Sequence, residues 1–336
     1  MRLASALFHA ASRAMPSVYI TRRVPPRGLS LLQQRQMQIS QWDSDAPVPQ
    51  DELMKGVVGK DALFCLLTDK IDKNVIQAAG PQLKVIGTMS VGYEHIDLAE
   101  CKSRGIIVGY TPDVLTDATA ELTVALLLAT SRRIVEGAAA VKSGEWSTWA
   151  PLWMCGPGLH GATVGVVGLG RIGMATARRL RPFGIQRLIY TGRSEKAEAK
   201  EVDAEFVSFE ALLQQSDFVI ATCPLNEQTK GLFNMKTFSQ MKRSAIFINS
   251  SRGGVVDQDD LYTALNTRLI GAAGLDVTVP EPLPPSHPLL SLANCVVLPH
   301  IGSANNETRN TMSALTAQNI IAAVDGKALP AQLTLP

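Results

Sequence analysis

The sequence feature that most limits the fold of this chain is a glycine-rich turn within TVGVVGLGRIG, residues 163–173. Its glycines have the spacing G-x-G-x-x-G, after an apolar run and before a helical pattern over 171–183. In this context the glycines permit a tight turn, the approach of a pyrophosphate, and close packing of helix on strand. The pattern predicts a dinucleotide at a helix N-terminus, rather than a glycine turn that holds no ligand. The predicted contacts are Gly168, Leu169, Gly170, Arg171, Ile172 and Gly173.

The end of the next predicted strand bears on the choice of dinucleotide. NAD sites usually carry Asp or Glu there, about 20 residues after the glycines, to bind the ribose 2′-OH. This chain instead has Gly192, Arg193 and Ser194. Arg193 can pair with a 2′-phosphate and Ser194 can hydrogen-bond to it, so we predict NADP(H). In the alternative reading, Arg193 is a solvated surface residue and Glu195 serves the ribose.

Apolar runs alternate with helical patterns in two series, which predicts α/β architecture with parallel sheets covered on both faces. The first series has runs at 17–23, 62–68, 83–90 and 106–110, with helical stretches at 72–79 and 96–103. The second has six, at 163–168, 187–192, 218–223, 245–250, 272–277 and 295–300, and six is the strand count of the doubly wound dinucleotide-binding fold. Three further elements are expected: a helix over 117–140 with Asp117 as N-cap, a loop over 146–161 and a last helix over 303–324.

Composition excludes several classes of protein. With 336 residues, of which 46% are hydrophobic, the chain can bury two cores. A net charge of +2 indicates neither a nucleic acid nor an anionic membrane as partner. The five cysteines form no C-x-x-C and no cluster with histidine, so we expect no metal site and a reducing, cytoplasmic compartment.

The N-terminus allows two interpretations. Residues 1–42 contain no Asp or Glu, and the first fourteen, MRLASALFHAASRA, have the composition of a mitochondrial transit peptide. The alternative is a poorly ordered start over residues 1–16, with Met15 as the initiator.

Five separated motifs give the chain a family resemblance. TMSVGYEHID (88–97), TPDVLTDATAEL (111–122), INSSRGGVVD (248–257), GLDVTVPEPLP (274–284) and LPHIGSA (298–304) resemble the D-isomer-specific 2-hydroxyacid dehydrogenases, in that family's order. The resemblance implies two Rossmann-like domains with doubly wound parallel sheets, the nucleotide-binding domain being inserted into a split substrate-binding domain. It places the substrate-binding domain at 17–117 and 300–336, and the NADP-binding domain at 118–299 with a dimerisation arm near 118–160.

The resemblance also implies three catalytic residues. Arg252 would grip the substrate carboxylate as a bidentate fork, and His300 would give a proton to the carbonyl oxygen as hydride arrives. Glu281 would hydrogen-bond to the far nitrogen of His300 and favour the charged imidazolium. Without the family match, a lone Arg in a loop and a Glu between prolines would be surface residues.

Other residues are placed around the reacting groups by the same resemblance. The backbone N–H groups of Val91 and Gly92 would bind the substrate carboxylate, unless they only form a turn. Asp276 would lie near both nicotinamide and substrate, either accepting from the carboxamide or ordering Arg252. Among the remaining histidines we expect a structural role for His95. The resemblance further assigns the cofactor to Pro224, Ser250, Asp276 and Gly302, and the substrate to Ser303.

The implied activity is reduction of small 2-ketoacids by NADPH. Within the family, QWDSD, TMSVG, GYTPDVLTD and LPHIGSA favour the members that reduce glyoxylate to glycolate and hydroxypyruvate to D-glycerate. The alternatives are an NADP(H)-sensing, corepressor-like binding module of the same fold, or a dehydrogenase for another small D-2-hydroxyacid. The aromatic loop with Trp146, Trp149 and Trp153 would form a homodimer arm, or else anchor the loop in the core.

Overall fold

The computed structural model describes residues 15–335, and these form two compact units. The second unit is Thr116–Ala304, and the first consists of the chain before and after it. The sequence interpretation set these boundaries at 117/118 and 299/300, so His300 falls in the second unit. The expected leader lies outside the described residues, apart from residues 15 and 16. Both units are α/β with wholly parallel sheets, which confirms the predicted fold class.

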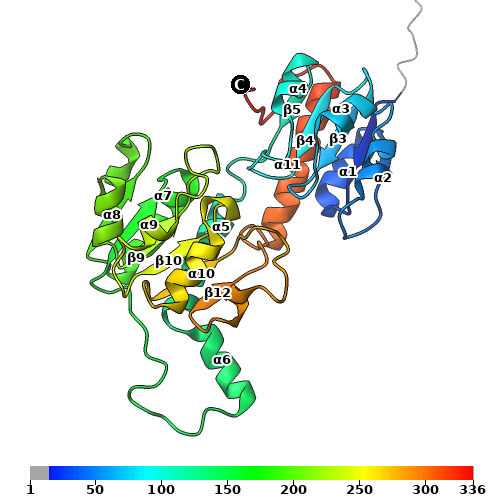
Figure 1. Ribbon diagram of the computed structural model, residues 1–336. Helices are drawn as coiled ribbons and strands as arrows, with labels where there is room; N and C mark the ends of the chain where they lie inside the picture. Colours follow the sequence, from blue (N-terminus) through cyan, green and yellow to red (C-terminus); the bar gives the residue numbers. More distant parts are fainter. Residues whose placement is uncertain (1–14, 336) are drawn as a thin grey trace, which may run out of the picture. The chain divides into compact units, whose positions relative to one another are not determined.

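The second unit is built on a seven-stranded sheet of order β12-β11-β10-β9-β6-β7-β8. This is the doubly wound order, in which the strand sequence reverses direction between β6 and β9. Figure 1 labels β9, β10 and β12 of this sheet. The strands are β6 (Thr163–Val167), β7 (Arg187–Thr191), β8 (Ala204–Phe206), β9 (Phe218–Ala221), β10 (Ile246–Asn249), β11 (Ala272–Leu275) and β12 (Cys295–Val297). The expected count of six was wrong, because β8 is a three-residue edge strand with a Glu at its centre and only β7 as a neighbour.

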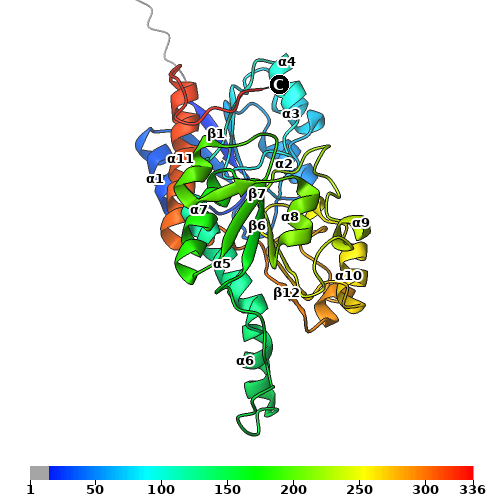
Figure 2. The ribbon, with the colours of Figure 1, turned by 90° about the vertical axis from the view of Figure 1, so that its left-hand side faces the viewer.

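Helices cover both faces of this sheet (Figure 2). One face packs on α5 (Thr116–Ser131) and α7 (Arg171–Leu180) through residues such as Val164, Val166 and Ile248. The other packs on α8 (Phe209–Gln215), α9 (Met235–Phe238) and α10 (Gln258–Asn266) through residues such as Val219 and Phe247. Because successive strand side chains point to opposite faces, a strand buried on both faces reads as one continuous apolar run.

The long helix expected over 117–140 is two helices. α5 ends at Ser131, Arg133 adopts a left-handed conformation with φ of +53°, and α6 (Ile134–Ser143) follows. No Gly or Pro marks this break, so the residue pattern across it still reads as helical. Asp117 is also not the N-cap, because α5 starts one residue earlier and Asp117 lies in its first turn.

The first unit has a five-stranded sheet of order β2-β1-β3-β4-β5. Its strands are β1 (Ser17–Ile20), β2 (Gln38–Gln41), β3 (Ala62–Cys65), β4 (Val85–Thr88) and β5 (Ile107–Gly109). Its helices are α1 (Pro26–Gln34), α2 (Gln50–Gly56), α3 (Lys73–Ala79), α4 (Leu98–Ser103) and α11 (Asn306–Val324). The sequence did not predict β2, because QISQ is mostly polar and β2 pairs only with β1 at the sheet edge.

The last helix joins the end of the chain to this first sheet. A Cβ on Gly28 of α1 would lie 2.2 Å from Ser313 Oγ of α11, so the two helices approach closely. Asn319 Nδ2 donates to Tyr110 O at 3.0 Å, and Asn319 Oδ1 accepts from Ala331 N at 2.9 Å. The first unit therefore depends on residues more than 200 positions apart in the sequence.

Candidate active site

The site residues expected in the second unit gather at one edge of its sheet. Gly168 directly follows β6, Gly192 follows β7, Ser250 follows β10 and Asp276 follows β11. Pro224 and His300 come three residues after β9 and β12. Since all strands are parallel, these positions share the carboxyl edge, where doubly wound sheets bind their ligands.

The three motif glycines meet different surroundings. Gly168 has φ of +97°, and a Cβ there would lie 2.8 Å from the backbone of Cys223. A Cβ on Gly173 would lie 2.5 Å from Gly168 O. A Cβ on Gly170 would meet nothing within 4 Å. Gly168 and Gly173 are therefore required by the fold, whereas Gly170 borders open space at the N-terminus of α7, where a pyrophosphate fits.

A residue that the sequence interpretation did not include holds the glycine turn. Thr222 Oγ1 donates to Gly168 O at 2.7 Å, and Thr222 N donates to Val167 O at 3.0 Å. Thr222 directly follows β9, which pairs with β6, so its hydroxyl fixes the turn from the neighbouring strand. A polar residue directly after a buried apolar strand was the available signal.

The end of β7 offers a basic and hydroxylic surface. Thr191 is buried, whereas Gly192, Arg193 and Ser194 are exposed. No Asp or Glu occupies positions 191–194. A 2′-phosphate on the adenosine ribose would therefore meet a guanidinium and a hydroxyl there rather than a repelling carboxylate.

His300 and Glu281 form a hydrogen-bonded pair. His300 Nδ1 lies 2.7 Å from Glu281 Oε2, and the two side chains are 24% and 28% exposed. The other carboxylate oxygen of Glu281 accepts from Thr278 N at 3.0 Å. Burial opposes ionisation of Glu281, but His300, Thr278 N–H and the charge of Arg252 together hold the pKa of Glu281 below its ordinary value. Glu281 is thus an anion that orients the imidazole, with Nε2 on the other side of the ring.

Asp276 holds the segment that carries the histidine. Its side-chain oxygens each accept one backbone N–H at 2.8 Å, from Ile301 and from Gly302. Its backbone oxygen accepts from His300 N at 2.9 Å. Burial raises the pKa of Asp276, while the two N–H groups and His300 favour its charged form. The structure thus gives Asp276 a role that the sequence interpretation did not consider, which is to fix His300 in its left-handed conformation with φ of +54°.

The backbone around Arg252 is held by contacts at the end of β10. Asn249, fully buried, donates from Nδ2 to Arg252 O at 2.9 Å and accepts from Ser251 N at 3.0 Å. A Cβ on Gly253 would lie 2.1 Å from Thr278 O, so the glycine lets this loop pack against the one that carries Glu281. The sequence interpretation missed Asn249, although a buried asparagine at the end of an apolar strand needs hydrogen-bond partners.

The remaining predicted residues lie in three places. Val91 and Gly92 form a turn beyond β4 of the first unit. Ser250 is 7% exposed, with its hydroxyl 2.7 Å from Thr123 Oγ1 of α5. Ser303 lies in the second unit, after the segment held by Asp276.

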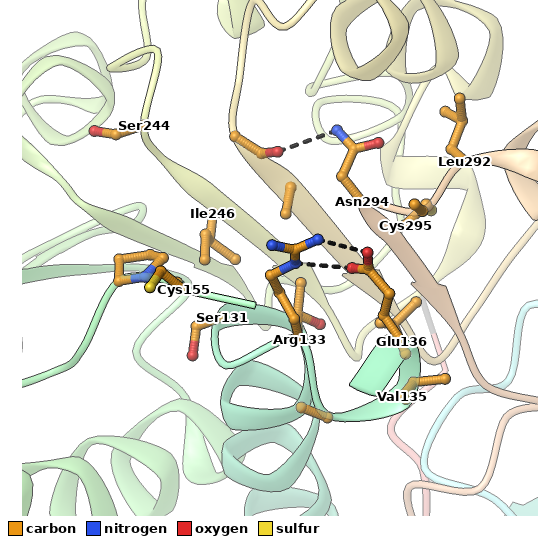
Figure 3. Close-up of a pocket in the computed structure, with 18 of the residues that line it drawn as sticks. Ser131, Arg133, Val135, Glu136, Cys155, Ser244, Ile246, Leu292, Asn294 and Cys295 are labelled. Atoms are coloured by element: carbon orange, nitrogen blue, oxygen red, sulfur yellow. Dashed lines mark hydrogen bonds and ion pairs between the residues drawn. The ribbon is translucent and has the colours of Figure 1, made fainter. Parts of the chain in front are cut away.

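A separate cavity of about 550 Å³ lies in the second unit (Figure 3). Its lining includes Ile246, Ala272 and Cys295, the first residues of β10, β11 and β12, so it lies at the amino edge of the sheet. Arg133 and Glu136, paired at 2.5 Å, face each other in it. It is therefore not the site of His300.

The described residues, 15–335, contain no metal-ligand cluster and no helix able to span a membrane. No group of three or more His, Cys, Asp or Glu side chains in that range is arranged to hold a metal ion. None of the helices in the same range combines the length and the apolar character needed to cross a bilayer.

Known proteins resemble the chain over nearly its whole length. A sequence model of the D-isomer specific 2-hydroxyacid dehydrogenase, NAD binding domain, matches residues 124–302. The glyoxylate reductase/hydroxypyruvate reductase of Homo sapiens is 57% identical over 320 residues, which are 95% of this chain and 98% of that protein.

Two solved structures show the same similarity. The TT0316 protein of Thermus thermophilus has a TM-score of 0.90 and 42% identity, covering 95% of this chain and 100% of that one. An NADPH-dependent glyoxylate/hydroxypyruvate reductase of Sinorhizobium meliloti, solved with NADP and malonate, has a TM-score of 0.83 and 30% identity. It covers 96% of this chain and 97% of its own.

Proposed function

The chain belongs to the D-isomer-specific 2-hydroxyacid dehydrogenases, and from this premise we propose that it reduces glyoxylate to glycolate and hydroxypyruvate to D-glycerate with NADPH. The observation that carries the proposal is the pairing of His300 Nδ1 with Glu281 Oε2 at 2.7 Å, on the sheet edge that holds the glycine turn. The human and Sinorhizobium relatives, both glyoxylate/hydroxypyruvate reductases by name, support the substrate pair.

In the proposed reaction, the residues of the chain transfer one proton and orient the reacting groups. NADPH, when bound, supplies the hydride that adds to the carbonyl carbon. The Nε2–H of the imidazolium of His300 gives its proton to the carbonyl oxygen, which becomes the hydroxyl of the product. Glu281 stabilises the imidazolium and holds the ring in place through Nδ1. The neutral imidazole that remains takes up a proton from solvent before the next turnover.

Substrate orientation falls to Arg252 and to the turn of the first unit. The guanidinium of Arg252 binds the substrate carboxylate through two parallel N–H bonds, which fixes the carbonyl group relative to the hydride donor. The N–H groups of Val91 and Gly92, in the first unit, are proposed to bind a substrate carboxylate.

Preference for NADPH over NADH is part of the proposal. It is supported by Arg193 and Ser194, both exposed beyond β7, and by the lack of an acid at 191–194. The glycine turn, Pro224, Ser250 and Gly302 would hold the rest of the cofactor at the carboxyl edge.

A kinetic panel tests the proposed function. NADPH and NADH are each offered with glyoxylate, hydroxypyruvate and pyruvate, and initial rates are followed by the absorbance of the reduced nicotinamide. We expect turnover of the first two ketoacids with NADPH, and a lower kcat/KM with NADH. Absence of turnover with both, together with retained NADPH binding, would favour the dinucleotide-sensing alternative.

We also propose that the protein is a homodimer, joined through α6 and the loop after it. Large apolar side chains are exposed there, including Leu152 at 90% and Trp149 at 80%. Single exposed apolar residues are normal, but seven of them within residues 134–153 favour an interface. The other exposed members are Ile134, Val135, Val141, Trp146 and Trp153.

Sedimentation of a charged variant tests the dimer. We expect the wild type to sediment as a dimer and Trp149→Glu combined with Leu152→Glu to sediment as a folded monomer. A wild type that is monomeric at micromolar concentration would refute the proposal. Val58→Glu, an exposed apolar position outside this loop, is the matched control.

A further inference from the structure

Beside the turn of Val91 and Gly92, the first unit holds two buried hydroxyl groups in a row that ends at a histidine. Thr88 is fully buried and Ser90 is 3% exposed. Ser90 Oγ lies 2.6 Å from Gly92 O and 2.7 Å from Thr88 Oγ1. Thr88 Oγ1 in turn lies 3.1 Å from His95 Nε2. The four groups form one continuous chain of hydrogen bonds.

Counting protons fixes the direction of every bond in that chain. A carbonyl oxygen can only accept, so Ser90 uses its single hydroxyl proton on Gly92 O. Thr88 must then donate to Ser90, which uses the only proton of Thr88. The remaining bond needs its proton from the ring, so His95 Nε2 carries hydrogen and donates to Thr88. Every donor therefore points along the chain toward the carbonyl of Gly92.

The carbonyl at the end of the chain belongs to the turn that the proposed function assigns to the substrate carboxylate. Glycine is the residue with the widest backbone freedom, so an unrestrained turn at Gly92 would need ordering when a ligand binds. Ser90 O accepts from Thr111 N at 2.9 Å and His95 O accepts from Ile71 N at 2.9 Å. The bond to Ser90 O fixes the plane of the Ser90–Val91 peptide, which carries the Val91 N–H, and the Ser90 hydroxyl fixes the plane of the Gly92–Tyr93 peptide. The Gly92 N–H belongs to the peptide between these two fixed planes.

We propose that His95 is a positioning residue for ketoacid binding, which acts through Thr88 and Ser90 to hold the N–H groups of Val91 and Gly92 in their binding orientation. This inference rests on the proposed function and deepens it. His95 itself does not touch the substrate. Its Nε2–H supplies the donor that Thr88 accepts, so the direction imposed by the Gly92 carbonyl is satisfied along the whole hydrogen-bond chain and the turn is held.

Kinetics of paired variants separate positioning from a general structural role. His95→Leu, Thr88→Val and Ser90→Ala each interrupt the chain. His95→Gln keeps an N–H donor near the position of Nε2, and Thr88→Ser keeps the hydroxyl. His160→Leu, an exposed histidine of the second unit, is the matched control. Each protein is assayed for the KM of glyoxylate and hydroxypyruvate, the KM of NADPH, kcat, and the thermal midpoint.

We expect the interrupting variants to raise the ketoacid KM about tenfold while kcat and the NADPH KM change less than about twofold. His95→Gln and Thr88→Ser should return the ketoacid KM to within about threefold of wild type. Because the bonds form one chain, Thr88→Val combined with His95→Leu should be no worse than either single variant.

Two kinetic results would overturn the inference. One is an unchanged ketoacid KM in His95→Leu, and the other is a His95→Gln protein as impaired as His95→Leu. A wild type without turnover is a different result, because it counts against the proposed function itself.

Nitrogen NMR tests the direction of the hydrogen-bond chain independently of enzyme activity. In protein labelled with ¹⁵N-histidine, the spectrum of His95→Gln identifies the His95 signals among those of five histidines. We expect a protonated Nε2 above neutral pH, and loss of that state in Thr88→Val. An unprotonated, pyridine-type Nε2 in the wild type would overturn the inference whatever the enzyme does.

Discussion

At the scale of single residues, the pair of His300 and Glu281 lets the effect of the Glu281 charge be tested apart from the effect of its shape. Glu281→Gln keeps the size of the side chain and removes the anion that stabilises the imidazolium. We expect kcat/KM for glyoxylate to fall about 100-fold or more, since a positioned acid or base contributes roughly 10²–10⁴ to rate. Steady-state assays with Glu210→Gln, an exposed glutamate of α8, as control check this. A loss below about threefold would contradict the assigned role.

Asp69 in the first unit predicts how stability depends on pH. It is 5% exposed, and its Oδ1 has no hydrogen-bond partner among the described residues. Burial raises the pKa of Asp69, against the hydrogen bonds from Thr21 and Leu66 and the charge of Arg22. The folded protein therefore keeps this proton to higher pH than the unfolded chain does. The unfolding free energy falls as pH rises from about 4, the ordinary pKa of aspartate, through the raised value, and is lower at neutral pH.

Asp69→Asn removes that ionisation and retains an oxygen that accepts from Thr21. Its stability relative to wild type should therefore increase from about pH 4 to about pH 7. Urea unfolding, followed by the fluorescence of Trp42, measures this relative stability. Trp42 is the one tryptophan of the first unit, and the other three tryptophans are replaced by phenylalanine so that Trp42 alone gives the signal. A relative stability that is constant over this range would contradict the assigned desolvation.

Residue identity alone predicted much of the candidate site, and geometry supplied the rest. The motif residues could be assigned because each lies in a sequence motif that resembles those of the family. The bonds of Asn249 and of the chain from His95 to Gly92 join residues at most seven positions apart, so they depend on loop conformation that residue types do not reveal. The role of Thr222 depends on strand alignment, because it bonds to Gly168, 54 residues away. The role of Asp276 differed for the same reason, since its carboxylate binds two N–H groups 25 and 26 residues away.

At the scale of elements, the turn between β6 and α7 predicts opposite effects for two neighbouring glycines. Gly170→Ala has room for its methyl group, so we expect wild-type stability and NADPH affinity lowered about tenfold or more. Gly173→Ala would bring its methyl group 2.5 Å from Gly168 O, so we expect destabilisation by about 1–3 kcal/mol. Thermal unfolding and fluorescence titration with NADPH separate the two. Equal stability losses would contradict this division.

Apolar strands could be predicted, including the edge strands β5 and β12, whereas the polar edge strands β2 and β8 could not. Strands buried on both faces, such as β9 and β10, appear as apolar runs that polar residues interrupt little. The strands β2 and β8 carry polar residues and contain no buried position, so they do not read as apolar runs. The break at Arg133 has no residue signal, since a left-handed arginine is uncommon and neither Gly nor Pro stands there; the ion pair with Glu136, three residues on, accompanies it.

At the scale of the whole molecule, the continuous second unit predicts an independent domain. Residues 116–304 contain all seven strands of their sheet, and both faces are covered by helices of the same segment. We expect this fragment to fold cooperatively and to bind NADPH, with no ketoacid reduction because Val91 and Gly92 are missing. Calorimetry and titration check both points. The fragment 15–115 is the contrast, and we expect it to stay unfolded without α11.

The discontinuity of the first unit has a consequence for biosynthesis. A ribosome that has finished β5 must still translate all of Thr116–Ala304 before α11 exists, which at about 5–20 residues per second takes roughly ten to forty seconds. Through that interval, the sheet face around Gly87 that Ile320 and Thr316 later cover stays open to water. We therefore expect nascent chains to engage chaperones through their earliest-made segment.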